Sequence, residues 1–103
     1  MIEKLIWMQG KVYSTLTHNK KFTIMEVTNN KIVIRNQKGS LRTIGRDELE
    51  KPWEKLIKDK QITQQQIYDT GSRNSAYIAA ILSNTIGVNG LIHPARLEFQ
   101  QTE

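Results

Sequence analysis

The side chains best suited to chemistry in this sequence are the lysines and arginines of its first half, and the group they suit is phosphate. Between positions 11 and 46 there are eight of them and a single acid, Glu26. A surface of one sign attracts polyanions, and cationic side chains bind the nucleic-acid backbone by neutralising its phosphates. The candidates are Lys20, Lys21, Arg35, Lys38, Arg42 and Arg46. A solvated, lysine-rich surface without a ligand explains the same charge equally well.

A second candidate group lies in the stretch DTGSRNSAYIAAIL, residues 69–82. Arg73 and Asn74 have side chains that can contact phosphates or base edges. The hydroxyls of Ser72 and Ser75, with the backbone N–H groups at a helix start, can also hold a phosphate. Every capped helix offers such a start, so an ordinary structural turn explains these residues too. We interpret Arg73 and Asn74 as additional nucleic-acid contacts.

The sequence offers little for catalysis or metal binding. It contains no cysteine, which excludes disulfides, thiolate zinc sites and cysteine nucleophiles. His18 and His93 are the only histidines, and nothing indicates that either meets a carboxylate or a nucleophile. The sequence has no metal-ligand spacing and no glycine-rich nucleotide loop. We therefore expect a protein that is not an enzyme and has no metal or cofactor.

Length and hydropathy indicate one domain outside the membrane. A chain of 103 residues is long enough for one modest core and too short for two. No apolar run reaches the roughly 18 residues that span a bilayer. We expect a cytoplasmic protein without a membrane partner.

The basic residues lie in a region with the period of β-strands. From residue 11 to residue 46 apolar and polar side chains alternate, which is typical of strands with one buried face. The segments FTIMEV, KIVIRN and LRTI are separated by TNN and NQKGS, which have turn chemistry. This pattern predicts an antiparallel meander of three or four strands, open or closed into a small barrel.

The period changes after Gly45. Apolar residues then recur at helical spacing to about residue 60, and Asp47 can cap this helix. Pro52 raises an alternative, in which residues 47–50 form a separate turn and the main helix begins near Lys51.

Two further helices are expected. Thr63 and Gln66 have the spacing of a capping box, which begins a short helix. Ser72 or Asn74 can cap a third helix, and Gly87 is suited to end it. The sequence thus predicts an α+β fold with one domain over residues 1–103. Its parts are a basic β-meander at 11–46, a helical part at 47–87, and a tail at 88–103 that forms a final strand or a wing.

The layout of a short helix, a glycine-containing turn and a second helix over residues 63–86 resembles helix-turn-helix DNA-binding modules. Ile67, Ile78 and Ile81 fall at positions that are buried in this family, and Gly71 lies one residue earlier than the usual turn glycine. With the tail folded into a hairpin, the arrangement would look like a winged helix. The resemblance implies a helix-turn-helix-like arrangement of the three helices and nucleic acid as partner, DNA in preference to RNA.

The third helix also suggests a different use. On this alignment its outward positions include Ala76, Ala79 and Ala80, which are too short to reach base edges. Small side chains let another chain approach closely, so this face is a candidate contact for a protein partner or a second copy. The leading hypothesis is a non-enzymatic nucleic-acid-binding protein that contacts mainly the backbone. The alternative is a small interaction or inhibitor protein, of accessory or phage type, that masks a protein partner or captures a phosphorylated ligand.

Overall fold

The structure is a computed structural model that describes residues 2–85, 88–92 and 95–99. In chain order the elements are η1 (Ile2–Met8), β1 (Val12–Ser14), β2 (Lys21–Val27), β3 (Lys31–Arg35), β4 (Leu41–Gly45), α1 (Arg46–Asp59), β5 (Gln61–Thr63), α2 (Gln64–Asp69), α3 (Ser75–Ser83), β6 (Val88–Ile92) and β7 (Ala95–Phe99). The predicted α+β class is confirmed, because an antiparallel meander is followed by helices. Within the described ranges no helix is long and apolar enough to cross a membrane.

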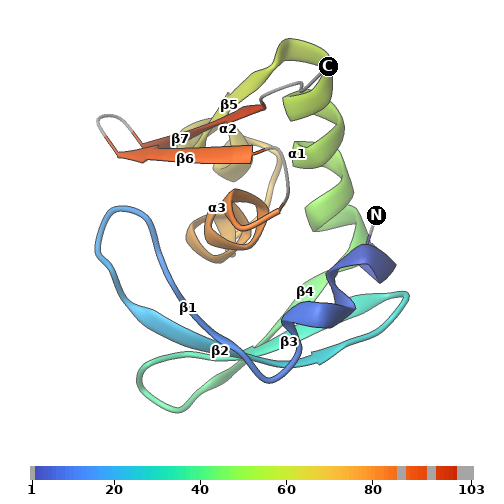
Figure 1. The fold of residues 1–103 in the computed structure, drawn as a ribbon, viewed down its shortest axis with the longest axis vertical. Helices are drawn as coiled ribbons and strands as arrows, with labels where there is room; N and C mark the ends of the chain where they lie inside the picture. The colour runs from blue at the N-terminus through green and yellow to red at the C-terminus, as the bar shows by residue number, and fades with distance from the viewer. Residues whose placement is uncertain (1, 86–87, 93–94, 100–103) are drawn as a thin grey trace.

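Helix α3 lies between two antiparallel sheets, as Figure 1 shows. The first sheet has the strand order β1-β2-β3-β4, and the second has the order β5-β7-β6. Helix α1 runs along one side of the molecule and connects the two sheets, since it follows β4 and precedes β5. This arrangement makes α3 the centre of the core.

The predicted meander forms an open sheet with β1 and β4 as its edges, and it is not closed into a barrel. Strand alternation places Phe22 and Ile24 on the inner face of β2, where both are buried. The register shifts between Ile24 and Glu26, which marks a β-bulge. The extra residue of the bulge lets Val27 face inward as well, although it lies three positions after Ile24.

Helix α1 begins before Asp47, because Gly45 occupies the N-cap position that we expected for Asp47. The Glu48 carboxylate accepts the Gly45 N–H at 2.7 Å and so satisfies one of the free donors at the helix start. Pro52 lies inside the continuous helix and is buried. The alternative of a separate turn over residues 47–50 is therefore wrong. Burial of the proline ring offsets part of the cost of the helical hydrogen bond that it cannot make.

The predicted capping box is confirmed at α2. The Gln66 N–H donates to Thr63 Oγ1 at 3.0 Å, and the Thr63 N–H donates to Gln66 Oε1 at 2.9 Å. Gly71, at φ +99°, then adopts the left-handed conformation that turns the chain toward α3. Helix α3 ends at Ser83, and Gly87, the expected end, lies outside the described residues.

The tail contains two strands, β6 and β7, which pair as an antiparallel hairpin. Strand β5, which the sequence pattern did not predict, pairs with β7 and places Ile62 opposite Leu97. Both side chains are fully buried. A strand of three residues is too short to show alternation of polar and apolar side chains. Strand β5 can therefore be identified only from its pairing with β7.

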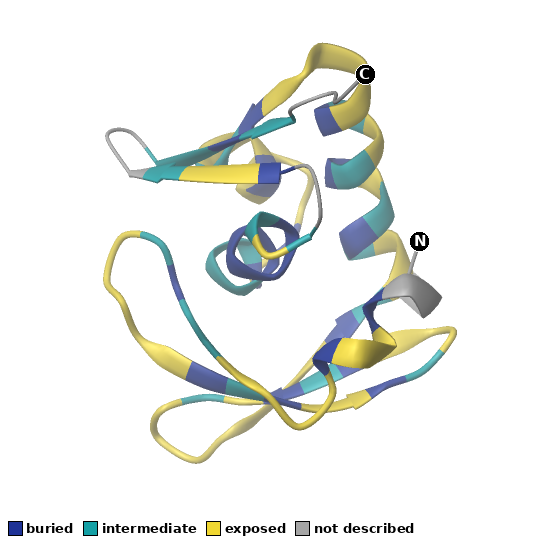
Figure 2. Ribbon diagram, in the orientation of Figure 1, coloured by how far each residue is buried: buried dark blue, intermediate teal, exposed yellow. Residues whose placement is uncertain are grey.

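The middle of α3 is buried on all sides, as Figure 2 shows. Its buried residues are Ile78, Ala79, Ala80, Ile81 and Leu82. A helix that is apolar all round is a core helix, and the two sheets cover this one from both sides. The expectation that Ala79 and Ala80 form an outward contact face is therefore wrong, since they are 1% and 0% exposed. Ala76, nearer the helix start, is half-buried.

Candidate functional site: a basic groove beside α3

A groove of about 850 Å³ opens where the start of β2, the β3–β4 turn and α3 meet. Its lining residues are Lys20, Asn36, Gln37, Lys38, Ser40, Leu41, Arg42 and Tyr77. Three of these are cations predicted to bind phosphate, and none of the eight is acidic. We call this feature the basic groove. Its positive charge favours anions, and Leu41 and Tyr77 add apolar surface to the lining.

Two turns position the lysines of the basic groove. Thr15 Oγ1 accepts the N–H of Lys20 at 3.0 Å in the β1–β2 turn. Asn36 Oδ1 accepts the N–H groups of Lys38 and Ser40, at 3.0 and 2.9 Å, and so closes the β3–β4 turn. Both lysines are exposed, and their ammonium groups can reach a ligand.

Arg42 is held from two sides. It lies opposite Ile34 in the register of β3 and β4, which places it on the inner face of the sheet. Its Nη1 donates to Asn74 Oδ1 at 3.4 Å, and its guanidinium carbon lies 5.8 Å from the centroid of the Tyr77 ring. Tyr77 packs edge-on against Phe22 with 5.2 Å between ring centroids. Because a guanidinium has five N–H donors, Arg42 keeps several of them for a phosphate.

Asn74 belongs to a buried polar network instead of a ligand-binding surface. It is 9% exposed, and its Nδ2 donates to Thr43 O at 3.3 Å and to Glu48 Oε1 at 3.1 Å. Ser72 Oγ also donates to Glu48 Oε1, at 2.8 Å. Ser72 and Asn74, which precede α3, therefore already donate hydrogen bonds to the Glu48 carboxylate. A phosphate at this place would meet a carboxylate, so we assign Asn74 and Ser72 a structural role.

Three other predicted cations lie away from the basic groove. Lys21 and Arg35 alternate with inward-facing neighbours and project from the outer face of the first sheet, where both are exposed. Arg46, at the start of α1, forms an ion pair with Glu50 at 2.6 Å. The structure thus divides the predicted set between two faces of the sheet and a helix start.

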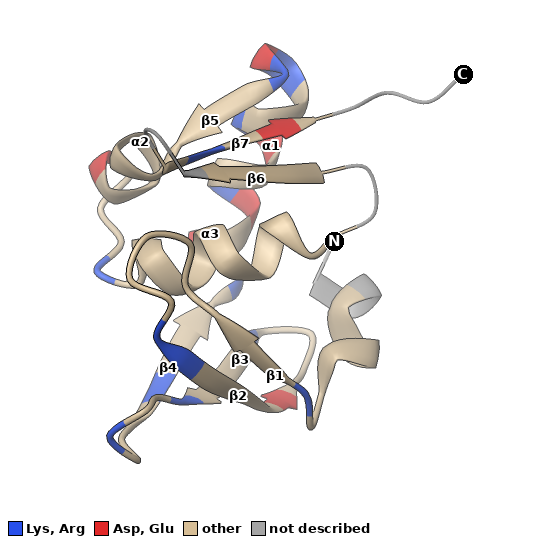
Figure 3. Cartoon of the chain, turned by 60° about the vertical axis from the view of Figure 1, so that its left-hand side comes forward, with Lys and Arg blue, Asp and Glu red and all other residues tan. Residues whose placement is uncertain are grey.

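Arg73, in the α2–α3 connection, is not among the lining residues of the basic groove. It is exposed and precedes Asn74, whose side chain accepts a hydrogen bond from Arg42. Figure 3 shows lysine or arginine at the start of β2, on β4, in the β3–β4 turn and in the α2–α3 connection, all on the same side of the view. Arg73 therefore adds positive charge on the same side of the molecule as the groove.

A half-buried tyrosine adjoins the pair of aromatic rings formed by Phe22 and Tyr77. Tyr13 lies 6.3 Å from Phe22 between ring centroids, and its hydroxyl is buried without a hydrogen-bond partner among the described residues. Desolvation by burial raises the pKa of Tyr13 above its ordinary value of 10.0. The phenol is therefore neutral at physiological pH and adds no negative charge near the groove.

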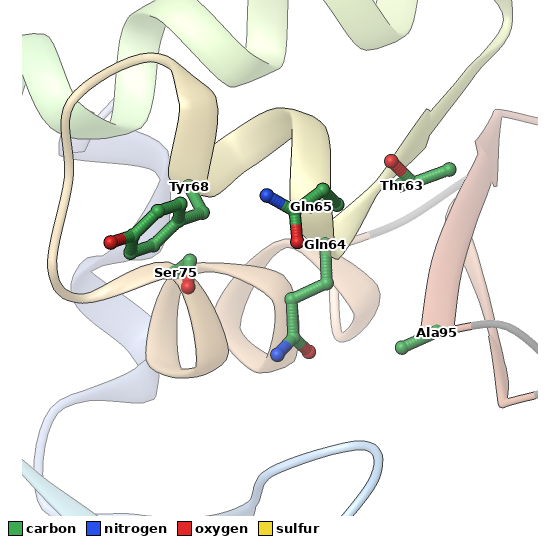
Figure 4. Close-up of a pocket in the computed structure, with 6 residues that line it drawn as sticks. All are labelled: Thr63, Gln64, Gln65, Tyr68, Ser75 and Ala95. Carbon is green, nitrogen blue, oxygen red and sulfur yellow. The ribbon is translucent and has the colours of Figure 1, made fainter.

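A second hollow, of about 590 Å³, lies between α2, the start of α3 and β7 (Figure 4). Its lining residues are Thr63, Gln64, Gln65, Tyr68, Ser75 and Ala95, and all six are uncharged. We call it the neutral hollow. No group of three or more histidine, cysteine, aspartate or glutamate residues suited to a metal ion occurs in the part of the chain that the structure describes.

The sequence contains a signal for the position of one groove residue, Arg42. Arg42 is two positions before Ile44, so strand alternation predicts that it shares the inner face of the sheet. The sequence contains no such signal for Tyr77. Its place on a helix does not predict which turn of the first sheet packs beside that helix. In comparisons with known proteins, no family model, no curated protein and no solved structure matches this chain.

Proposed function

We propose that this protein is a non-enzymatic nucleic-acid-binding protein that holds backbone phosphates in the basic groove. The observation that carries this proposal is the convergence of Lys20, Lys38 and Arg42 on one groove whose lining residues include no acid. Cations that neutralise phosphates supply most of the sequence-independent affinity for nucleic acid. Tyr77, in the same groove, offers an aromatic ring for contact with a sugar or a base.

The fixed position of Arg42 supports this use. Its contacts with Asn74 and Tyr77 hold the guanidinium in place before a ligand arrives, so less side-chain entropy is lost on binding. A guanidinium can also bind a phosphate through two parallel hydrogen bonds. Lys20 and Lys38, which are exposed, act as adaptable point charges on either side of this fixed donor.

The order of elements in the second half of the chain supports DNA in preference to RNA. From α1 to β7 the chain runs helix, strand, helix, helix, strand, strand, and it pairs the strands in the order β5-β7-β6. This order resembles a winged helix, the module suggested for residues 63–86 and the tail. Because α3 is buried, we do not propose that it enters a DNA groove as a reading helix. The proposed contact is with the backbone.

The alternative function is supported only in part. Masking of a protein partner through the alanines of α3 loses its support, because the sheets cover Ala79 and Ala80. Capture of a small phosphorylated ligand uses the same groove chemistry as backbone binding. A competition assay separates these two sources of phosphate.

The test is fluorescence anisotropy with labelled single strands and duplexes of DNA and of RNA, with inorganic phosphate and mononucleotides as competitors. Contacts with three phosphates predict a fall in affinity of about 20- to 40-fold between roughly 50 and 200 mM salt. We expect DNA to bind more tightly than RNA and millimolar phosphate to compete weakly. Absence of binding to all four nucleic acids at the lower salt concentration would overturn the proposal. Tight binding of mononucleotides alone would assign the groove to a small ligand.

A further inference from the structure

Several polar side chains of the neutral hollow make no hydrogen bond with another described residue. The Tyr68 side chain is 57% exposed, and Ser75 is half-buried at the start of α3. Neither hydroxyl has a hydrogen-bond partner in the described ranges. Figure 4 shows Tyr68, Gln64 and Ser75 around the same open space. The hollow thus combines an exposed aromatic ring with unused hydrogen-bonding groups and no charge.

Three consecutive glutamines line or flank this hollow, and they differ in what holds them. Gln66 closes the capping box with Thr63, and Gln65 Nε2 donates to Asp69 Oδ1 at 3.1 Å. Gln64 is different, because its Oε1 is buried and no described residue donates a hydrogen bond to it. A buried carbonyl without a partner is costly, and such groups are uncommon in folded proteins. The Gln64 amide therefore has an unused acceptor, and rotation of the side chain would present this group to a ligand in the hollow.

The chemistry of the hollow fits a nucleobase. A base has a flat face that stacks on an aromatic side chain, and it has an edge of neutral donors and acceptors that a glutamine amide can match. A phosphate or another charged group would find no counter-charge among the six lining residues. We propose that the neutral hollow binds one base of the strand, with Tyr68 stacking on it and Gln64 and Ser75 bonding to its edge.

The position of the hollow relates it to the basic groove. Ser75 lines the hollow and Tyr77 lines the groove, and both belong to the first turn of α3. Residues two apart on a helix project from nearly opposite sides, so about one helix diameter, roughly 10 Å, separates the two places. A strand with phosphates in the groove can place a nearby base in the hollow. In this form the inference rests on the proposed function.

The test compares two labelled strands of equal length and charge, one with bases and one abasic, by fluorescence anisotropy at low salt. For the wild type we expect binding of the strand with bases to be about tenfold tighter, which corresponds to ~1.4 kcal/mol. Tyr68→Ala and Gln64→Leu should each reduce this ratio at least threefold and leave the salt dependence unchanged. Gln61→Leu is the matched control, because this exposed glutamine of β5 does not line the hollow, and it should keep the wild-type ratio. Circular dichroism checks that each variant is folded.

The outcomes separate this inference from the proposed function. Equal binding of both strands by the wild type, or equal effects of Gln64→Leu and Gln61→Leu, would overturn the base site while backbone binding stands. If neither strand binds, the proposed function fails, and NMR with free nucleosides at millimolar concentration decides about the hollow. A shift of the Gln64 side-chain amide would then support a site for free bases. The absence of a shift would overturn the base site as well.

Discussion

Asn74 and Arg73 are neighbours with opposite roles. Both were predicted to contact nucleic acid, since their side chains suit base edges and phosphates. In the fold the Asn74 amide links β4, α1 and the α2–α3 connection through hydrogen bonds with Thr43, Glu48 and Arg42. Arg73 remains exposed. Residue type alone does not tell these cases apart, because burial is decided by segments far away in the sequence.

Substitution of this pair separates stability from binding. We expect Asn74→Ala to lower the free energy of unfolding by about 1 to 2 kcal/mol, because it removes the side-chain donor to the Thr43 carbonyl and one of the two donors to Glu48 Oε1, the other being Ser72. Arg73→Ala should change stability by less than about 0.5 kcal/mol, as expected for an exposed residue, and should weaken nucleic-acid binding. Urea denaturation measures the first effect and anisotropy the second. Equal stability of the two variants would contradict the structural role of Asn74.

At the scale of elements, α3 is the part whose environment differs most from expectation. The start of α3 after the Gly71 turn and its apolar spacing were visible in the sequence, as were the capping box of α2 and the strands of the meander. The predicted side-chain cap was wrong, because Asn74 occupies the N-cap position of α3 without a capping hydrogen bond. The burial of α3 on both sides was not visible, because alanines are compatible with a close contact to another chain and equally with a close contact to a sheet. The short strand β5 was missed for a related reason, since it is defined by its pairing with β7.

The burial of α3 predicts the effect of enlarging one of its alanines. We expect Ala79→Leu to lower stability by about 2 kcal/mol, because the extra carbons must fit between two packed sheets. The oligomeric mass should be the same as in the wild type. Ala76→Leu, at a half-buried position, is the matched control and should cost less. Thermal unfolding and light scattering check both expectations, and a fully stable Ala79→Leu protein with an altered mass would contradict the core position of this residue.

At the scale of the whole molecule, the basic groove forms because distant segments meet. Lys20, Lys38 and Arg42 come from two turns and an edge strand of the first sheet, while Tyr77 comes from α3 in the centre. The excess of positive charge in residues 11–46 was evident from the sequence. Its division into groove residues and the outer-face residues Lys21 and Arg35 depended on strand register and on which turn approaches α3.

The most direct test of the basic groove is the salt dependence of DNA binding by two double variants with equal net charge. In one, Lys20 and Lys38 of the groove are changed to glutamine; in the other, the exposed Lys51 and Lys58 of α1 are changed to glutamine. We predict that the groove variant binds more weakly and that its slope of log affinity against log salt is smaller by about 1.8 for duplex DNA or about 1.4 for single strands, as expected for the loss of two phosphate contacts. The α1 variant should keep the wild-type slope. Equal slopes in the two variants would show that net charge alone drives binding, and would contradict a phosphate site in the basic groove.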